Sequence, residues 1–102
     1  SLEAASALTQ PVAHGDAYIL NDLGAALQQL WRLQEAEVVL RRAVELAPGN
    51  GYATAMNNLG VTLKELGRSQ EAGEWLQRAV KIDAANYARR LLLLLLEDGN
   101  AG

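Results

Sequence analysis

The chain of 102 residues carries 9 Lys and Arg against 12 Asp and Glu, and this net charge of −3 argues against nucleic acid or an anionic membrane as its partner. It has no cysteine and one histidine, which excludes disulfides, thiolate metal sites and a histidine relay. Its longest apolar run, residues 91–96, is far shorter than the roughly 20 residues that span a bilayer. Leu (19 residues) and Ala (18) dominate, and this density of strong helix formers predicts an all-α protein.

The first predicted element is a short helix over residues 2–9, where Leu2, Ala5 and Leu8 recur at helical spacing. Pro11 ends this helix, and the residues up to Gly15 form a linker. His14 lies in the linker with no candidate partner near it in the sequence, so we interpret it as a solvated loop residue.

The centre of the chain contains an internal repeat. A shift of 36 residues aligns residues 17–48 with residues 53–84, and 14 of the 32 aligned positions are identical. Chance would give about three identities in a chain so rich in Ala and Leu. The sequence therefore predicts two copies of one unit, at residues 17–50 and 53–86. The same shift aligns Ala7 with Ala43, so residues 2–15 correspond to the second helix of a truncated preceding unit and its linker.

Each unit is predicted to form two helices joined by a tight turn. Apolar residues of the first helix recur every three or four positions, at Leu20, Leu23, Leu27 and Leu30 in unit 1 and at Met56, Leu59, Leu63 and Leu66 in unit 2. The second helices show the same period, with Ala36, Leu40 and Ala43 matched by Ala72, Leu76 and Ala79. Pro48, Gly49 and Asn50 end the second helix of unit 1.

Glycines mark two special places in the units. Gly24 and Gly60 lie in the middle of the first helices, where Gly costs about 1 kcal/mol relative to Ala. We interpret them as points where the partner helix comes close, rather than as ligand sites. Gly67 suits a turn with positive φ, but Trp31 stands at the equivalent position of unit 1. We expect a slightly altered turn with Trp31 half buried; the alternative is an exposed contact residue.

The last predicted element is a separate helix over residues 87–98, capped by Asp83 or Asn86 and ended by Gly99. Its six consecutive leucines surround the helix completely, and one neighbouring repeat can cover only part of them. A missing downstream repeat, a second chain or an aggregating end would each explain this composition, and we expect a homodimer. The self-association residues are Leu91, Leu92, Leu93, Leu94, Leu95 and Leu96.

The duplicated positions resemble the tetratricopeptide repeat signature. They are Leu20, Leu23, Gly24, Leu27, Ala36, Leu40, Ala43 and Pro48 in unit 1, and Met56, Leu59, Gly60, Leu63, Ala72, Leu76, Ala79 and Ala84 in unit 2. The resemblance implies a single all-α domain, a short right-handed TPR-like α-solenoid of antiparallel helix pairs with N- and C-terminal flanking helices.

The resemblance also implies a peptide-binding groove on the concave face, lined by the first helices of the two units. By position, its residues are Tyr18, Asn21, Asp22, Ala25 and Gln28 from unit 1 and Thr54, Asn57, Asn58, Val61, Lys64 and Glu65 from unit 2. Asn58 matches the family's peptide-gripping asparagine, whereas Asn21 and Asn57 could equally bond within the fold. Asn21 stands where the family's carboxylate clamp has Lys, so a free C-terminal carboxylate is not the expected ligand.

No catalytic constellation, phosphate loop or metal-ligand cluster is present in the sequence. We therefore expect no enzyme, no cofactor and no small-molecule substrate. Two hypotheses stay open: an interaction module that binds a peptide segment of a partner protein, and a structural element that self-associates through the leucine-rich helix. No basic segment precedes an apolar stretch at the start of the sequence, so the cytoplasm is the default location.

Overall fold

The structure, a computed structural model, describes residues 15–47 and 52–101. The helix predicted over residues 2–9, His14 and the turn at residues 48–50 lie outside this part of the chain. The described residues form four helices: α2 (Gly15–Gln29), α3 (Leu33–Leu46), α4 (Ala53–Glu65) and α5 (Ser69–Ala101). The prediction of an all-α fold is confirmed.

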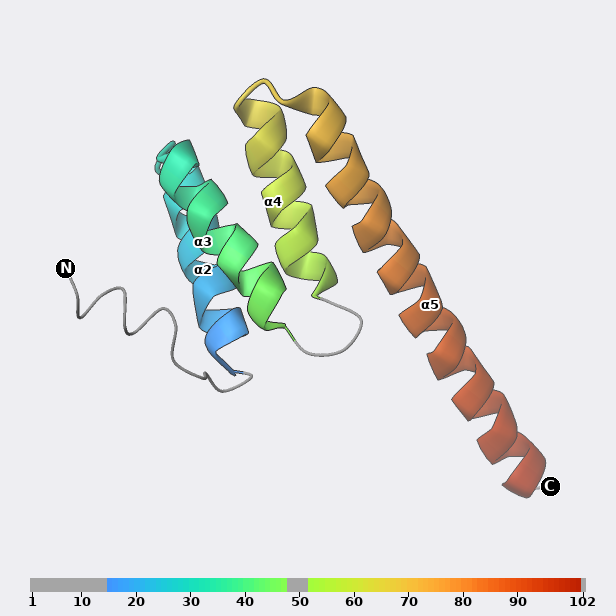
Figure 1. The fold of residues 1–102 in the computed structure, drawn as a ribbon. Helices are drawn as coiled ribbons and strands as arrows, with labels where there is room; N and C mark the ends of the chain where they lie inside the picture. Colours follow the sequence, from blue (N-terminus) through green and yellow to red (C-terminus); the bar gives the residue numbers. More distant parts are fainter. Residues whose placement is uncertain (1–14, 48–51, 102) are drawn as a thin grey trace.

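The helices pack as two consecutive antiparallel pairs (Figure 1). The first pair, α2 and α3, is unit 1, and α4 with the first half of α5 is unit 2. Helix α4 also lies against α3 and, over a smaller area, against α2, so it joins the two units. This arrangement is the stacked helical repeat that the duplicated sequence predicts.

One hydrophobic core runs through both units because apolar stripes from all four helices converge on it. Its buried members are Leu27, Ala36, Leu40, Leu59, Leu63 and Ala72. A second, smaller cluster contains Ala53, Met56 and Ala79. The small side chains of the buried alanines leave room for neighbouring helices to approach.

The two mid-helix glycines are confirmed as points of close approach within each pair. A Cβ atom placed on Gly24 would lie 2.4 Å from Cδ2 of Leu40, and one on Gly60 would lie 2.7 Å from Cδ2 of Leu76. Both distances are far below van der Waals contact. Each unit therefore uses the same glycine to admit the same leucine of its second helix.

The turns inside the two units have similar backbones but different residues. Gly67 has a φ of 85° and Trp31 a φ of 60°, so both adopt the left-handed conformation. Glycine adopts it freely, whereas the Cβ of a tryptophan is strained there by about 1–2 kcal/mol. Trp31 is 68% exposed, so the expectation of a half-buried side chain was wrong.

Helix α5 is one continuous helix of 33 residues, and the predicted break before residue 87 was wrong. Asp83 and Asn86 can cap a helix, but no Pro or Gly lies between Gly73 and Gly99 to end the preceding one. Ala84 and Ala85 instead favour continued helix. Gly99 does not end it either, since α5 runs to Ala101. The second half of α5 extends beyond α4 toward the C-terminus (Figure 1).

Candidate functional site

The two neighbouring helices α2 and α4 carry all the residues predicted for the groove. Six of these side chains are exposed: Tyr18, Asp22, Thr54, Asn57, Lys64 and Glu65. Ala25, Gln28, Asn58 and Val61 are partly buried. Asn21 is the one fully buried member of the set. The structure therefore brings the predicted residues together on adjacent helices, and it leaves most of them accessible.

Asn21 holds the two units together instead of facing solvent. It is 4% exposed, and its Oδ1 accepts a hydrogen bond of 2.9 Å from Nδ2 of Asn58. Its own Nδ2 donates to the hydroxyl of Tyr52 at 3.3 Å. Of the two roles open for Asn21, the structure thus shows bonding within the fold. A buried amide needs such partners, because an unpaired one is costly.

The exposed groove residues of α2 and α4 together form what we call the α2–α4 surface. Two tyrosines form one end of it. The ring of Tyr18 contacts that of Tyr52 edge to face, with centroids 4.8 Å apart. Burial raises the pKa of the Tyr52 hydroxyl, and the negative charge of Asp22 raises it further. Tyr52 therefore stays protonated at neutral pH, when its oxygen accepts the bond from Asn21.

A hollow opens at the other end of this surface, where α2 and α4 finish. Its volume is about 340 Å³, and its lining consists of Gln28, Gln29, Trp31, Leu33 and Glu65. Sequence reasoning included Gln28 and Glu65 in the groove but did not place Trp31 beside them. The feature of the sequence that could have identified Trp31 as a site residue is its position, because the equivalent residue of unit 2 is Gly67.

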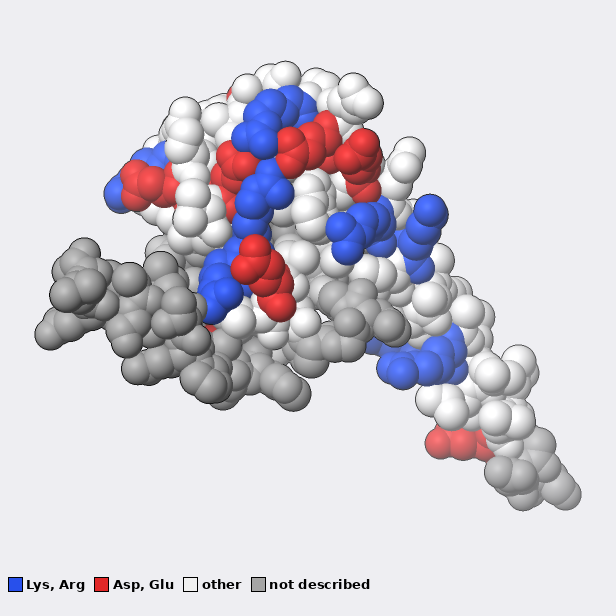
Figure 2. All heavy atoms as spheres, viewed as in Figure 1, with Lys and Arg blue, Asp and Glu red and all other residues white. Residues whose placement is uncertain are grey.

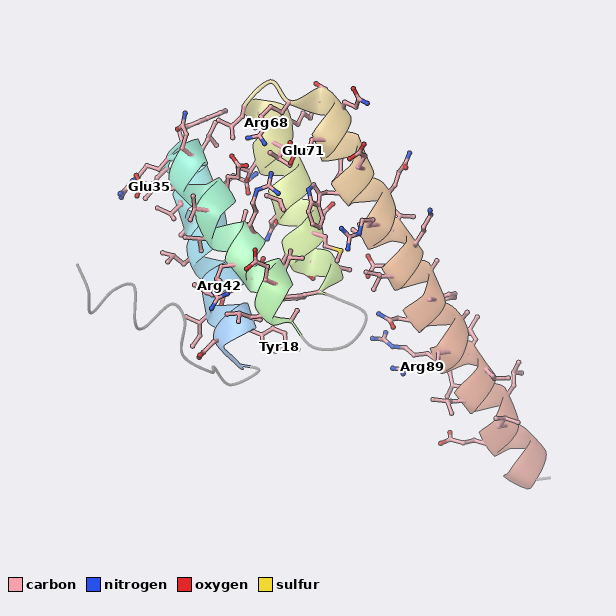
Figure 3. The ribbon with its side chains drawn as sticks, viewed as in Figure 1. Tyr18, Glu35, Arg42, Arg68, Glu71 and Arg89 are labelled. Carbon is pink, nitrogen blue, oxygen red and sulfur yellow. The ribbon has the colours of Figure 1, made fainter. Side chains whose placement is uncertain are left out.

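A cluster of four charged residues joins the units through α3 and the start of α5. Glu37 pairs with Arg41 at 2.9 Å and with Arg68 at 2.8 Å, and Glu71 pairs with both arginines. Figure 2 shows acidic and basic side chains gathered in a band on this face, and Figure 3 shows Arg68 and Glu71 beside the α4–α5 turn. The sequence analysis did not identify these ion pairs between units.

The two arginines act on Glu71 directly. Their hydrogen bonds and positive charges hold the pKa of the Glu71 carboxyl below its ordinary value of 4.5. Glu71 in turn raises the pKa of Arg41 and of Arg68. Arg41, Arg68 and Glu71 therefore remain ionised at neutral pH, and the ion pairs of the cluster link the two units.

The leucine-rich half of α5 forms a second exposed surface. Residues 83–97 are all exposed, and the six leucines at residues 91–96 range from 44% to 67% exposure. Arg89, labelled in Figure 3, lies on this projecting part of the helix. The predicted self-association residues are therefore accessible along the whole run.

Within residues 15–47 and 52–101, no group of acidic or histidine side chains is arranged to hold a metal ion. In the same part of the chain, no helix has the length and apolar character needed to cross a membrane.

In a comparison with protein families, residues 15–85 match the model of the tetratricopeptide repeat. The match spans α2, α3, α4 and the first half of α5, which is well over half of the chain. No curated protein and no solved structure matches the chain significantly.

Proposed function

Because the chain belongs to the tetratricopeptide repeat family, we propose that α2 and α4 together bind an extended segment of a partner protein. Domains of this family generally mediate protein–protein interaction. The observation that carries the proposal is the exposure of polar side chains on two adjacent first helices, above all Thr54 and Asn57. An amide offers a donor and an acceptor together, so it matches a peptide backbone unit.

Asn58 supports the same proposal in a second way. Its Nδ2 donates to Asn21, which fixes the orientation of the amide. Its Oδ1 is then held ready to accept a backbone N–H from a bound segment. A preorganised acceptor loses less conformational entropy on binding than a free side chain.

The test uses peptides selected from a random library by the intact chain, with dissociation constants measured by fluorescence anisotropy. Replacing Thr54 and Asn57 by Ala removes two exposed polar groups without touching the buried amide of Asn21. We expect the double variant to bind about ten- to a hundredfold more weakly, since each hydrogen bond contributes about 0.5–1.5 kcal/mol.

The matched control replaces Gln34 and Gln70 by Ala. Both are exposed amides on the second helices, outside the α2–α4 surface. This variant should bind like the parent chain. Equal affinity of the Thr54/Asn57 variant and the parent would contradict the proposal, provided circular dichroism shows that the variant is folded.

A second candidate function is self-association through the leucines of α5. Covering each leucine would contribute roughly 1.5–3 kcal/mol, and none of the described residues covers them. Charge favours an antiparallel pair, because it brings the end with Arg89 and Arg90 close to Glu97 of the second copy. A parallel pair would instead place Arg89 and Arg90 beside the same two arginines of the second copy, where like charges repel each other.

Sedimentation equilibrium at high micromolar concentration tests this candidate. Leu93 and Leu95 are two residues apart and point to opposite sides of the helix, so replacing both by Glu disrupts the contact whichever face is used. The parent should sediment as a dimer and this variant as a monomer. Val38→Glu, at an exposed valine of α3, is the control that should remain dimeric. A monomeric parent would exclude the candidate.

A further inference from the structure

The turn of unit 1 holds a side chain that contributes little to the fold. Trp31 adopts a φ of 60°, and Gly67 adopts a similar conformation at the equivalent position without a side chain. Trp31 is also 68% exposed. A strained backbone combined with an exposed aromatic ring is typical of a contact site rather than of a packing site.

The surroundings of Trp31 are polar and acidic. The hollow of about 340 Å³ beside it is lined by Gln28, Gln29, Leu33 and Glu65, of which two have amide side chains and one has a carboxylate. Leu33 is buried, so it forms an apolar floor. The ion pairs between described residues use Glu35, Glu37, Glu45 and Glu71, and none of them uses Glu65.

We propose that this hollow binds an arginine side chain of the partner segment. A guanidinium group stacks flat on an indole and donates hydrogen bonds in a planar fork. One face would lie on Trp31, while its N–H groups reach the Glu65 carboxylate and the amide oxygens of Gln28 or Gln29. The protein already uses this pairing elsewhere, since the guanidinium carbon of Arg78 lies 4.5 Å from the ring centroid of Trp75.

The chemistry of the lining disfavours the other classes of side chain. Glu65 repels a carboxylate, and a purely apolar side chain would cover Glu65 and two amides without pairing them, which is costly. A lysine would satisfy the charge but cannot stack flat or donate in a fork. The hollow lies at the end of the surface formed by α2 and α4, where a bound partner segment would reach it. The inference rests on the proposed function only in taking the arginine from that segment.

The first experiment follows the two indole N–H signals of the chain by NMR during titration with N-acetyl-arginine amide. Trp31 and Trp75 are the only tryptophans of the sequence, and Trp31→Gly assigns their signals. We expect a saturable shift of the Trp31 signal and an unmoved Trp75 signal. Glu65→Gln should weaken binding roughly three- to tenfold, as expected for a charge pair with a stacked cation.

N-acetyl-leucine amide and N-acetyl-glutamine amide serve as matched probes without charge. The proposal is overturned if leucine amide binds as well as arginine amide, if arginine amide produces no saturable shift, or if Glu65→Gln leaves its affinity unchanged. Screening by added salt should weaken arginine binding and leave any binding of the neutral probes unaffected.

Trp31→Gly supplies a readout that a merely structural role would not give. Because Gly67 already adopts this conformation, the variant should raise the melting temperature and at the same time lose arginine binding, followed here from the guanidinium signals of the arginine amide itself. A lowered melting temperature, or retained arginine binding, contradicts the proposal.

The Thr54→Ala/Asn57→Ala variant separates this inference from the proposed function. It should keep the shift produced by arginine amide, because neither residue lines the hollow. If the double variant binds arginine amide and also keeps the parent's affinity for the selected peptides, only the proposed function is contradicted. Weakened peptide binding with no arginine shift in either chain would remove only the inference.

Discussion

Equivalent residues of the two units have different surroundings. Asn21 is 4% exposed and hydrogen-bonded to unit 2, whereas Asn57, its counterpart 36 residues later, lies in solvent. Val44 packs against the core, whereas Val80 is 67% exposed. The difference arises because α4 covers this side of unit 1, while no described residue covers the same side of unit 2. One sequence motif therefore serves packing in one copy and leaves an open surface in the other.

The charged positions differ between the units as well. Glu37 and Arg41 of α3 reach across to Arg68 and Glu71, but the counterparts of Glu37 and Arg41 in α5 are Gly73 and Gln77. On the side of unit 1, the contact between units thus depends on two residues that unit 2 does not repeat. The second helix of unit 2 therefore lacks the charged partners with which the turn of a further, identical unit would form ion pairs.

The largest expected difference between equivalent positions concerns Leu59 and Leu23. Leu59 is fully buried, so Leu59→Ala should lower the free energy of unfolding by roughly 2–5 kcal/mol. Leu23 is 47% exposed, and Leu23→Ala should cost about 1 kcal/mol or less. Urea unfolding followed by circular dichroism measures both. Equal losses would show that the units do not differ in packing as described.

Glycine substitutions test the close approach of helices within unit 2. Gly60→Ala would place a Cβ 2.7 Å from the Leu76 side chain and 3.2 Å from the carbonyl oxygen of Ala72, so it should cost about 1–3 kcal/mol. Gly73→Ala meets nothing within 4 Å and should instead stabilise the chain by about 0.5–1 kcal/mol. Thermal unfolding would reveal the opposite signs. The same sign for both would refute the close contact at Gly60.

Exchanging the turn residues tests the strain in unit 1. Trp31→Gly should raise the free energy of unfolding by about 1 kcal/mol, because it releases the side chain from a left-handed backbone. Gly67→Trp should lower it by a similar amount in unit 2. The comparison would fail if both variants were destabilised in urea unfolding.

The smallest expected effect is a pH dependence that distinguishes Glu71 from Glu35. The folded-state pKa of Glu71 lies below its ordinary value of 4.5, so its stabilising contribution is present above that pH and is lost as the pH falls through the lowered pKa. The Glu71→Gln variant has no carboxylate to protonate at this position. Its free energy of unfolding should therefore fall less than that of the parent chain as the pH decreases from about 5 to about 3.

Glu35→Gln is the control for that measurement. Glu35 pairs with Arg32 alone, within one unit, and both side chains are more than half exposed. Its removal should change the acid limb of the stability curve less than the removal of Glu71. If the two variants gave indistinguishable curves of unfolding free energy against pH, the ion pairs between units would not stabilise the Glu71 carboxylate.

Much of the fold could be predicted from the sequence, because periodic apolar stripes and repeated small residues fix helices and their close contacts locally. Gly24 and Gly60 are clear examples, since the same residue recurs with the same neighbour. The continuity of α5 was harder to predict. Asp83 and Asn86 signal a helix start, but nothing nearby ends the helix that precedes them.

The candidate site was predictable in outline only. The repeat placed the groove residues on α2 and α4, but the burial of Asn21 depends on a hydrogen bond to Asn58 in the other unit. Likewise, the position of Trp31 beside Glu65 depends on how the ends of α2 and α4 meet. Such contacts arise from stacking, and a pattern within one unit does not contain them.

The most direct test of the account measures stability and peptide affinity for Asn21→Ala and Asn57→Ala side by side. We predict that Asn21→Ala loses about 1–2 kcal/mol of unfolding free energy, since it removes two hydrogen bonds and leaves the partly buried Asn58 and Tyr52 without these partners. We predict that Asn57→Ala keeps its stability and loses affinity for the selected peptides. Equal stability losses in the two variants, or unchanged peptide affinity in Asn57→Ala, would contradict the division between a packed surface and an open binding surface.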